Sequence, residues 1–281
     1  MASIVQRSVM TVVAVLLGGF LFLVFCIWIL QEKIAFQPER PPFPDPGSAI
    51  RVDYSAADGQ KLFAYLVGDP RHSAGLVIAF HGNADLAVRW LDWANEIRTR
   101  TGLAVMLPEY RGYNGIEGRP AYASVGLDAE GAFTFAREWL AISSDRFAYF
   151  GHSLGSAVAA ELAVRHPPRA LLLEAPFTSA HDMARRMAGR WLIGSVWRLV
   201  SRLHFDTEGI VALIETPVSV VHGKRDRVVP FRMGEKVYQS AKVKGEWLSV
   251  PEASHSDVRY VAGEPYWAWV VHALIPLTMT E

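Results

Sequence analysis

The stretch that decides the fold is Phe147-Ala148-Tyr149-Phe150-Gly151-His152-Ser153-Leu154-Gly155-Ser156-Ala157. An apolar run leads into Gly-x-Ser-x-Gly, and a segment rich in small residues with a helical pattern follows. A serine at the tip of a sharp strand-to-helix turn needs glycine on both sides, because a side chain there would meet the neighbouring strand or helix. This context predicts that Ser153 is a nucleophile rather than a glycine-flanked helix cap.

Strand and helix patterns alternate on both sides of this turn. Apolar or alternating runs predict strands at 50–55, 61–67, 76–80, 103–107, 147–150, 170–173, 218–221 and 246–250. Helical patterns lie at 86–97, 123–140, 154–165, 233–239 and 265–274. Two antiparallel strands followed by repeated strand–helix units predict an α/β fold: a mostly parallel eight-stranded sheet with helices on both faces. We expect residues 50–281 to form this domain.

Ser153 needs a base, and the base needs an acid to orient it. Ligands of parallel sheets bind at the carboxyl ends of the strands. His255 follows the strand at 246–250, and Asp226 follows the strand at 218–221. We therefore predict a Ser153–Asp226–His255 triad. Glu174, at the end of the strand at 170–173, is the alternative acid.

The segment Phe80-His81-Gly82-Asn83-Ala84 also joins a strand to a helix. The tetrahedral intermediate of acyl transfer needs N–H donors for its oxyanion. We predict that the backbone N–H groups of Asn83 and Leu154 supply them. His81 has no second ligand at metal spacing, so we interpret it as shaping this loop and expect neither a metal nor a cofactor.

Six motifs in order resemble those of the α/β-hydrolase superfamily. They are His81-Gly82-Asn83, residues 108–113, Gly-x-Ser-x-Gly at 151–155, residues 174–179, His-Gly-x-x-Asp at 222–226 with Val229-Pro230, and Ser254-His255. The most similar branch is that of the membrane-associated α/β-hydrolase-domain proteins and related bacterial serine hydrolases. The resemblance spans residues 50 to 272 and implies metal-independent hydrolysis of esters, thioesters or lysophospholipids. Glu109 replaces the usual Asp, and residues 114–118 depart from the pattern, in a loop expected to rim the site.

Composition excludes several other classes of function. The chain has 28 basic and 28 acidic side chains, which is not the charge of a nucleic-acid binder. Its single cysteine excludes an intramolecular disulfide, a Cys-x-x-Cys pair and a thiolate zinc cluster.

Residues 9–30 predict one transmembrane helix, preceded by a short flank at 1–8. No charged residue lies between Arg7 and Glu32, and 22 helical residues span about 33 Å, against about 30 Å for a hydrocarbon core. A cleaved signal peptide would have a shorter apolar stretch and a small-residue cleavage site. Positive charges lie on both sides of the span, so they predict no orientation.

Residues 31–49 are expected to link this helix to the domain. The five prolines between 38 and 46 exclude a helix or a central strand. The linker is therefore either an extended spacer or a strap lying on the domain surface.

Residues 177–206 interrupt the alternation and predict a short helical lid over the site. Met183, Met187 and Trp191 recur at helical spacing, as do Leu192, Val196 and Val200, so we expect two short amphipathic helices. The lid carries several arginines, among them Arg185 and Arg186. They form either a solvated face or a surface for anionic lipid headgroups.

Together these features predict a membrane-anchored serine hydrolase that cleaves carboxylic esters or thioesters. Its expected partners are an acyl ester or lipid-like substrate and the lipid bilayer. Two alternatives stay open. A serine peptidase would share the triad. A non-catalytic, membrane-tethered binding protein on a hydrolase scaffold would usually lack a triad or oxyanion residue.

Overall fold

The computed structural model describes residues 2–188, 197 and 200–278, and its centre is one eight-stranded sheet. The strands are β1 (Ile50–Ser55), β2 (Lys61–Val67), β3 (Leu76–Phe80), β4 (Ala104–Pro108), β5 (Phe147–His152), β6 (Ala170–Glu174), β7 (Val218–Gly223) and β8 (Lys244–Val250). Their order is β1-β2-β4-β3-β5-β6-β7-β8. β1 and β2 pair antiparallel, β2 pairs antiparallel with β4, and every other pairing is parallel. The predicted sheet is confirmed.

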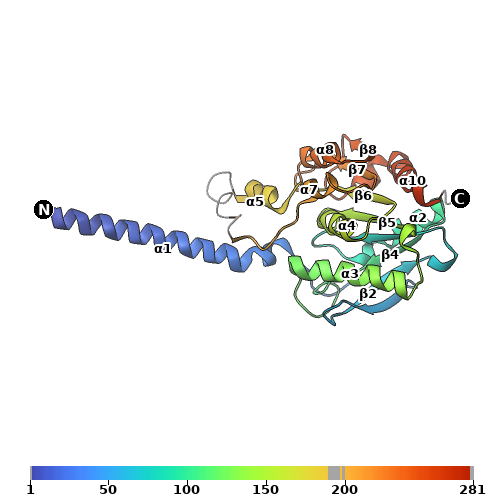
Figure 1. The fold of residues 1–281 in the computed structure, drawn as a ribbon, viewed down its shortest axis with the longest axis horizontal. Coiled ribbons are helices and arrows are strands. Elements are labelled where there is room, and N and C mark those ends of the chain that lie inside the picture. The colour runs from blue at the N-terminus through green and yellow to red at the C-terminus, as the bar shows by residue number, and fades with distance from the viewer. Residues whose placement is uncertain (1, 189–196, 198–199, 279–281) are drawn as a thin grey trace.

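Helices cover both faces of the sheet (Figure 1). The α-helices are α1 (Ala2–Ala35), α2 (Leu91–Thr101), α3 (Tyr122–Glu138), α4 (Leu154–Arg165), α5 (Ala180–Ala188), α7 (Thr207–Val211), α8 (Phe231–Ser240), α9 (Val258–Ala262) and α10 (Glu264–Thr278). α3, α4, α7 and α8 are successive neighbours in one layer, and α2 packs against α10 in the other. β3, β5, β6 and β7 are buried along their whole length, as expected of parallel strands covered on both faces.

Helix α1 extends away from the domain on the side where α5 lies (Figure 1). It is longer than the predicted span at 9–30, and its part Gln6–Ala35 is long and apolar enough to cross a membrane. Its last turns pack on the domain. The Gln31 side chain is 2% exposed, donates to the carbonyl of Val200 at 3.0 Å and accepts from the Arg202 N–H at 2.6 Å.

The proline-rich segment after α1 lies on the domain surface. We call residues 36–45 the strap. Phe36 is buried, and the carboxylate of Glu39 accepts two hydrogen bonds from the guanidinium of Arg89, at 2.6 and 2.7 Å. Phe43 packs against the core farther along. Of the two interpretations of this segment, the structure favours the strap over a free spacer.

The lid is described only in part. α5 overlaps the first of its two predicted helices, whose Trp191 lies outside the described residues, as does most of the second, at 192–196 and 198–199. The five-residue helices α7 and α9 are additional to the prediction. They are too short to produce a helical period in the sequence.

We expect Gly155→Ala to destabilise the protein. A Cβ there would lie 2.1 Å from the carbonyl oxygen of Phe80, so backbone would have to move. We predict a loss of about 3 kcal/mol in the free energy of unfolding, measured by chemical denaturation in detergent micelles. Gly126→Ala is the control, because its Cβ meets nothing within 4 Å inside α3. It should stabilise by roughly 0.5–1 kcal/mol. Equal stabilities of the two variants would contradict this account of the turn.

Candidate active site

Ser153 lies at the tip of the turn between β5 and α4. Its φ of +52° is in the left-handed region, which a serine adopts at a cost of about 1–3 kcal/mol. A Cβ on Gly151 would lie 2.2 Å from the Gly155 carbonyl oxygen, so the turn has no room for a side chain there. The flanking glycines are needed for the steric reason that the sequence indicated.

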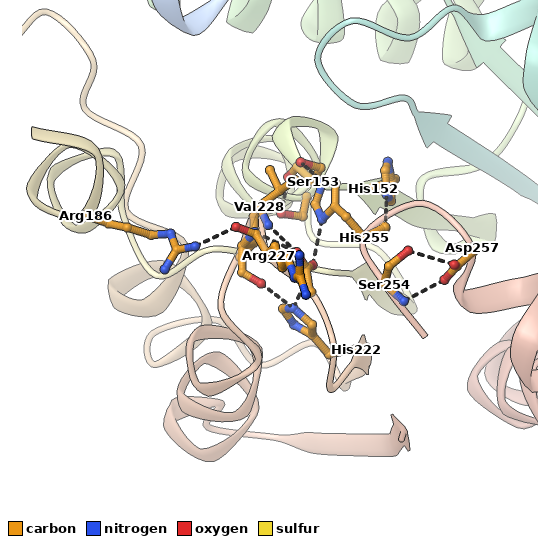
Figure 2. A network of polar contacts seen from close by, with 12 residues as sticks. His152, Ser153, Arg186, His222, Arg227, Val228, Ser254, His255 and Asp257 are labelled. Atoms are coloured by element: carbon orange, nitrogen blue, oxygen red, sulfur yellow. Dashed lines mark hydrogen bonds and ion pairs between the residues drawn. The ribbon is translucent and has the colours of Figure 1, made fainter. Parts of the chain in front are cut away.

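The three predicted triad residues come together at the carboxyl edge of the sheet, where Figure 2 shows Ser153 beside His255. Ser153 Oγ lies 2.9 Å from Nε2 of His255, and His255 Nδ1 lies 2.7 Å from Oδ2 of Asp226. The His255 side chain is 14% exposed and that of Asp226 is fully buried. In this arrangement the serine hydroxyl can donate to Nε2 of the imidazole, and the Nδ1–H of the same ring donates to the carboxylate.

Four hydrogen-bond donors converge on the Asp226 carboxylate. Oδ1 accepts from the N–H groups of Val228 and Val229, each at 2.8 Å. Oδ2 accepts from His255 and also from Nε2 of His222, at 3.1 Å. Burial alone would raise the pKa of Asp226, but the hydrogen bonds from His222 and His255 outweigh it and hold this pKa well below its ordinary value. Asp226 is therefore ionised at neutral pH.

His222 is a second histidine on this aspartate, and the sequence analysis gave it no role of its own. The side chain is fully buried, and its Nε2 also lies 3.0 Å from the carbonyl oxygen of Val229. Its place at the end of β7, four residues before Asp226, was the available signal.

The rival acid is engaged elsewhere. Glu174 is buried and accepts a hydrogen bond from the Tyr266 hydroxyl at 2.7 Å. Asp257 accepts from both the N–H and the hydroxyl of Ser254, and so orders the loop that carries His255 (Figure 2).

The predicted oxyanion loop lies beside Ser153. A Cβ on Gly82 would lie 2.8 Å from Nδ1 of His152 and 3.4 Å from Cβ of Ser153. Neither the Asn83 nor the Leu154 N–H donates to any residue that the structure describes. Leu154 is the first residue of α4, where N–H groups have no partner within the helix. Both groups are thus available to a ligand.

The His81 side chain connects this loop to Glu109, the residue that follows β4. Its Nε2 lies 2.7 Å from Oε1 of Glu109, and Oε2 of Glu109 accepts from the Ala87 N–H at 3.1 Å. Burial alone would lower the pKa of His81, but the Glu109 carboxylate beside it outweighs burial and raises this pKa. Glu109 is fully buried, so our expectation that this departure lies at the rim of the site is wrong for Glu109 itself. Its carboxylate contacts the oxyanion loop from the protein interior, through His81 and the Ala87 N–H.

Helix α5, in the predicted lid, contacts the loop that carries Asp226. A guanidinium N–H of Arg186, on α5, donates to the carbonyl of Arg227 at 2.5 Å (Figure 2).

In the part of the chain that the structure describes, no three His, Cys, Asp or Glu side chains are grouped to hold a metal ion.

Comparison with known proteins gives consistent similarities. Residues 71–209 match the family described as serine aminopeptidase, S33. The uncharacterized protein Rv2307c of Mycobacterium tuberculosis is 32% identical, over 91% of this chain and 90% of its own. The lysophosphatidylserine lipase ABHD12 of Danio rerio is 31% identical over 59% of this chain and 47% of its own. The structure of the Pyrococcus furiosus esterase Pf2001 has a TM-score of 0.64 and 20% identity, over 85% of this chain and 98% of that one.

The lowered pKa of Asp226 predicts a dependence of stability on pH. An unfolded aspartate titrates near pH 3.9, so the stabilisation by ionised Asp226 is complete above about pH 5. It is lost as the pH falls further, because the unfolded chain then takes up the proton first. Between pH 5 and pH 3 the free energy of unfolding of the wild type should fall by on the order of 1 kcal/mol more than that of Asp226→Asn. Asp92→Asn, which removes an exposed carboxylate, should keep the wild-type slope. Parallel slopes for wild type and Asp226→Asn would contradict the prediction.

Proposed function

The chain belongs to the α/β-hydrolase superfamily, and from this premise we propose that it is a serine hydrolase of carboxylic esters or thioesters. The observation that carries the proposal is the continuous hydrogen-bond path from Ser153 through His255 to Asp226. The two available N–H groups beside Ser153 support it further. A hydroxyl, a base, an orienting carboxylate and unoccupied donors are the groups that acyl transfer requires.

The first half of the reaction forms an acyl-enzyme. Ser153 Oγ attacks the acyl carbonyl carbon while His255 Nε2 takes the hydroxyl proton. Ionised Asp226 keeps Nδ1 as the protonated nitrogen and stabilises the imidazolium. The oxyanion forms beside the N–H groups of Asn83 and Leu154. One such donor contributes about 3 kcal/mol to the transition state in enzymes where it has been measured.

The second half releases the acid. His255 gives its proton to the leaving alcohol or thiol, and the carbonyl re-forms as an ester of Ser153. Water, deprotonated by His255, then attacks this ester. The fatty or other carboxylic acid leaves and Ser153 regains its proton, so the protein needs no cofactor for the cycle.

Helix α1 extends the proposal to the membrane. We assign residues 1–8 as a flank, a single membrane span within 9–30, a linker at 31–49 and the catalytic domain at 50–281, with the lid at about 177–206. An anchor next to the domain holds the site near lipids, which favours a lipid-like acyl substrate. The name of the zebrafish relative, a lysophosphatidylserine lipase, supports the same class.

A serine peptidase is the second candidate, because the family matched by residues 71–209 is described as serine aminopeptidase. Peptide and ester hydrolysis use the same triad, so the site geometry does not separate them. The third candidate, a non-catalytic binding protein, is disfavoured by the complete path from Ser153 to Asp226.

A fluorophosphonate probe should label the full-length protein in detergent, and Ser153→Ala should abolish labelling. Ser143→Ala, which changes an exposed serine on another loop, should label like the wild type. Asp226→Asn should lower kcat on p-nitrophenyl acetate by about 10⁴-fold, because the imidazole then adopts the wrong tautomer. Persistent labelling of Ser153→Ala would overturn the assignment of the nucleophile.

The substrate class is tested by a panel of p-nitrophenyl esters with acyl chains from C2 to C16, beside aminoacyl p-nitroanilides. We expect higher kcat/KM on the esters, with a preference for acyl chains longer than C2. Faster turnover of the aminoacyl amides would instead identify a peptidase.

A further inference from the structure

The side chain of Asn83 is held by two donors that come from outside the catalytic loops. Its Oδ1 accepts from the Tyr113 hydroxyl at 2.8 Å and from the backbone N–H of Gln37 at 2.7 Å. A carbonyl oxygen has two lone pairs, and both are used here. The Asn83 side chain is therefore fixed in one orientation, and it connects the predicted oxyanion loop to the strap.

The strap donor is itself fixed in place. Gln37 lies two residues beyond the end of α1. On one side of it, Phe36 is buried, with its ring 6.5 Å from that of Phe205. On the other side, Glu39 forms the two-bond ion pair with Arg89, which precedes α2. The N–H of Gln37 is thus held from both sides.

The end of α1 is also bonded to the returning end of the lid. Gln31 makes two of these bonds, to the Val200 carbonyl and from the Arg202 N–H. In addition, a guanidinium N–H of Arg202 donates to the Trp28 carbonyl at 3.0 Å and lies 3.2 Å from the Glu32 carboxylate. The last turns of α1 therefore lie between the lid and the oxyanion loop, at the carboxyl edge of the sheet where Ser153 is found.

The oxyanion loop needs such support. Ala84, next to Asn83, has a φ of +51°, a left-handed conformation that alanine adopts only at a cost. The buried pair of His81 and Glu109 holds the inner side of the loop. On its outer side, the loop is held by the two hydrogen bonds that the Asn83 side chain accepts. Without them, the strained backbone is free to relax and to turn the Asn83 N–H away from the oxyanion.

We propose that the backbone N–H of Gln37, in the strap, positions the Asn83 N–H for catalysis, together with the Tyr113 hydroxyl. Gln37 and Tyr113 are positioning residues that act through Asn83. The proposal rests on the proposed hydrolase function. It makes catalysis depend on how the membrane helix is seated on the domain, because the donor lies directly after that helix.

The first test removes the strap donor in the full-length chain, reconstituted in phosphatidylcholine nanodiscs. Gln37→Pro deletes the N–H that reaches Asn83. Its matched control, Arg40→Pro, adds a proline to the same strap where the N–H has no partner among the described residues. On p-nitrophenyl acetate we expect kcat to fall about tenfold in Gln37→Pro, with KM within twofold of wild type, because a misplaced oxyanion donor affects the transition state alone. Arg40→Pro should match the wild type in both constants.

The second test removes the other donor. Tyr113→Phe keeps the buried ring and deletes the hydroxyl. Tyr54→Phe is its control, because the Tyr54 hydroxyl is buried with no hydrogen-bond partner among the residues that the structure describes. We expect the same fall in kcat in Tyr113→Phe and none in Tyr54→Phe. The two donors share one acceptor atom, so the double variant should lose no more activity than Asn83→Ala. If Gln37→Pro does not fold, as judged by its thermal unfolding, the Tyr113 pair decides.

Wild-type kcat in both donor variants would overturn the proposal. So would a raised KM with unchanged kcat, because the strap would then serve substrate binding. Fluorophosphonate labelling separates this failure from that of the hydrolase function. A wild type that neither labels nor turns over ester refutes the proposed function itself. A wild type that labels, beside donor variants that react at the same rate, refutes only the role of the strap.

Discussion

The contact on which the rest of this structure depends is the close approach of two backbones at the Ser153 turn. α4 begins so near to β3 that Gly155 has no room for a methyl group. This closeness forces Ser153 into the left-handed region and raises its side chain above the sheet. It also brings the loop after β3 against the serine, since Gly82 packs against His152 and Ser153. Ser153 and the predicted oxyanion loop are thus placed by one steric constraint.

The acid and base loops depend on a second, polar arrangement. Asp226 receives two backbone N–H groups from its own loop and two imidazoles, one from β7 and one from the loop after β8. Because the carboxylate accepts hydrogen bonds from four donors, it cannot rotate, and it fixes the orientation of the His255 ring. The ends of β7 and β8 therefore determine that orientation. His222 supplies the donor on the side away from the serine. The site is therefore built on the rigid sheet, although its residues belong to loops.

The fold could be predicted because its central strands are short buried runs, and a buried strand such as Leu76–Phe80 has a distinct local pattern. The serine turn could be predicted from its glycines. The candidate triad followed from the rule that loops at the carboxyl edge of a sheet meet, and its catalytic role stays a prediction. Other features had no local signal. The segment predicted as one helix at 86–97 is a 3₁₀ turn at Ala87–Trp90 followed by α2, which ends at Thr101. The link from Gln37 to Asn83 joins residues 46 positions apart through a backbone donor, which no side-chain pattern reveals.

The burial of Gln31 has a consequence for how the molecule would sit in a bilayer. The helix contacts the domain from Trp28 onward, so the free part of the possible span runs from Gln6 to Ile27 and is about 33 Å long. A hydrocarbon core of about 30 Å is thinner than this, and such hydrophobic mismatch is relieved by tilting the helix or thickening the bilayer locally. Because α1 joins the domain through fixed contacts rather than a loose tether, a tilt of the helix rotates the whole domain. Bilayer thickness would then set the angle at which the carboxyl edge of the sheet meets the headgroups.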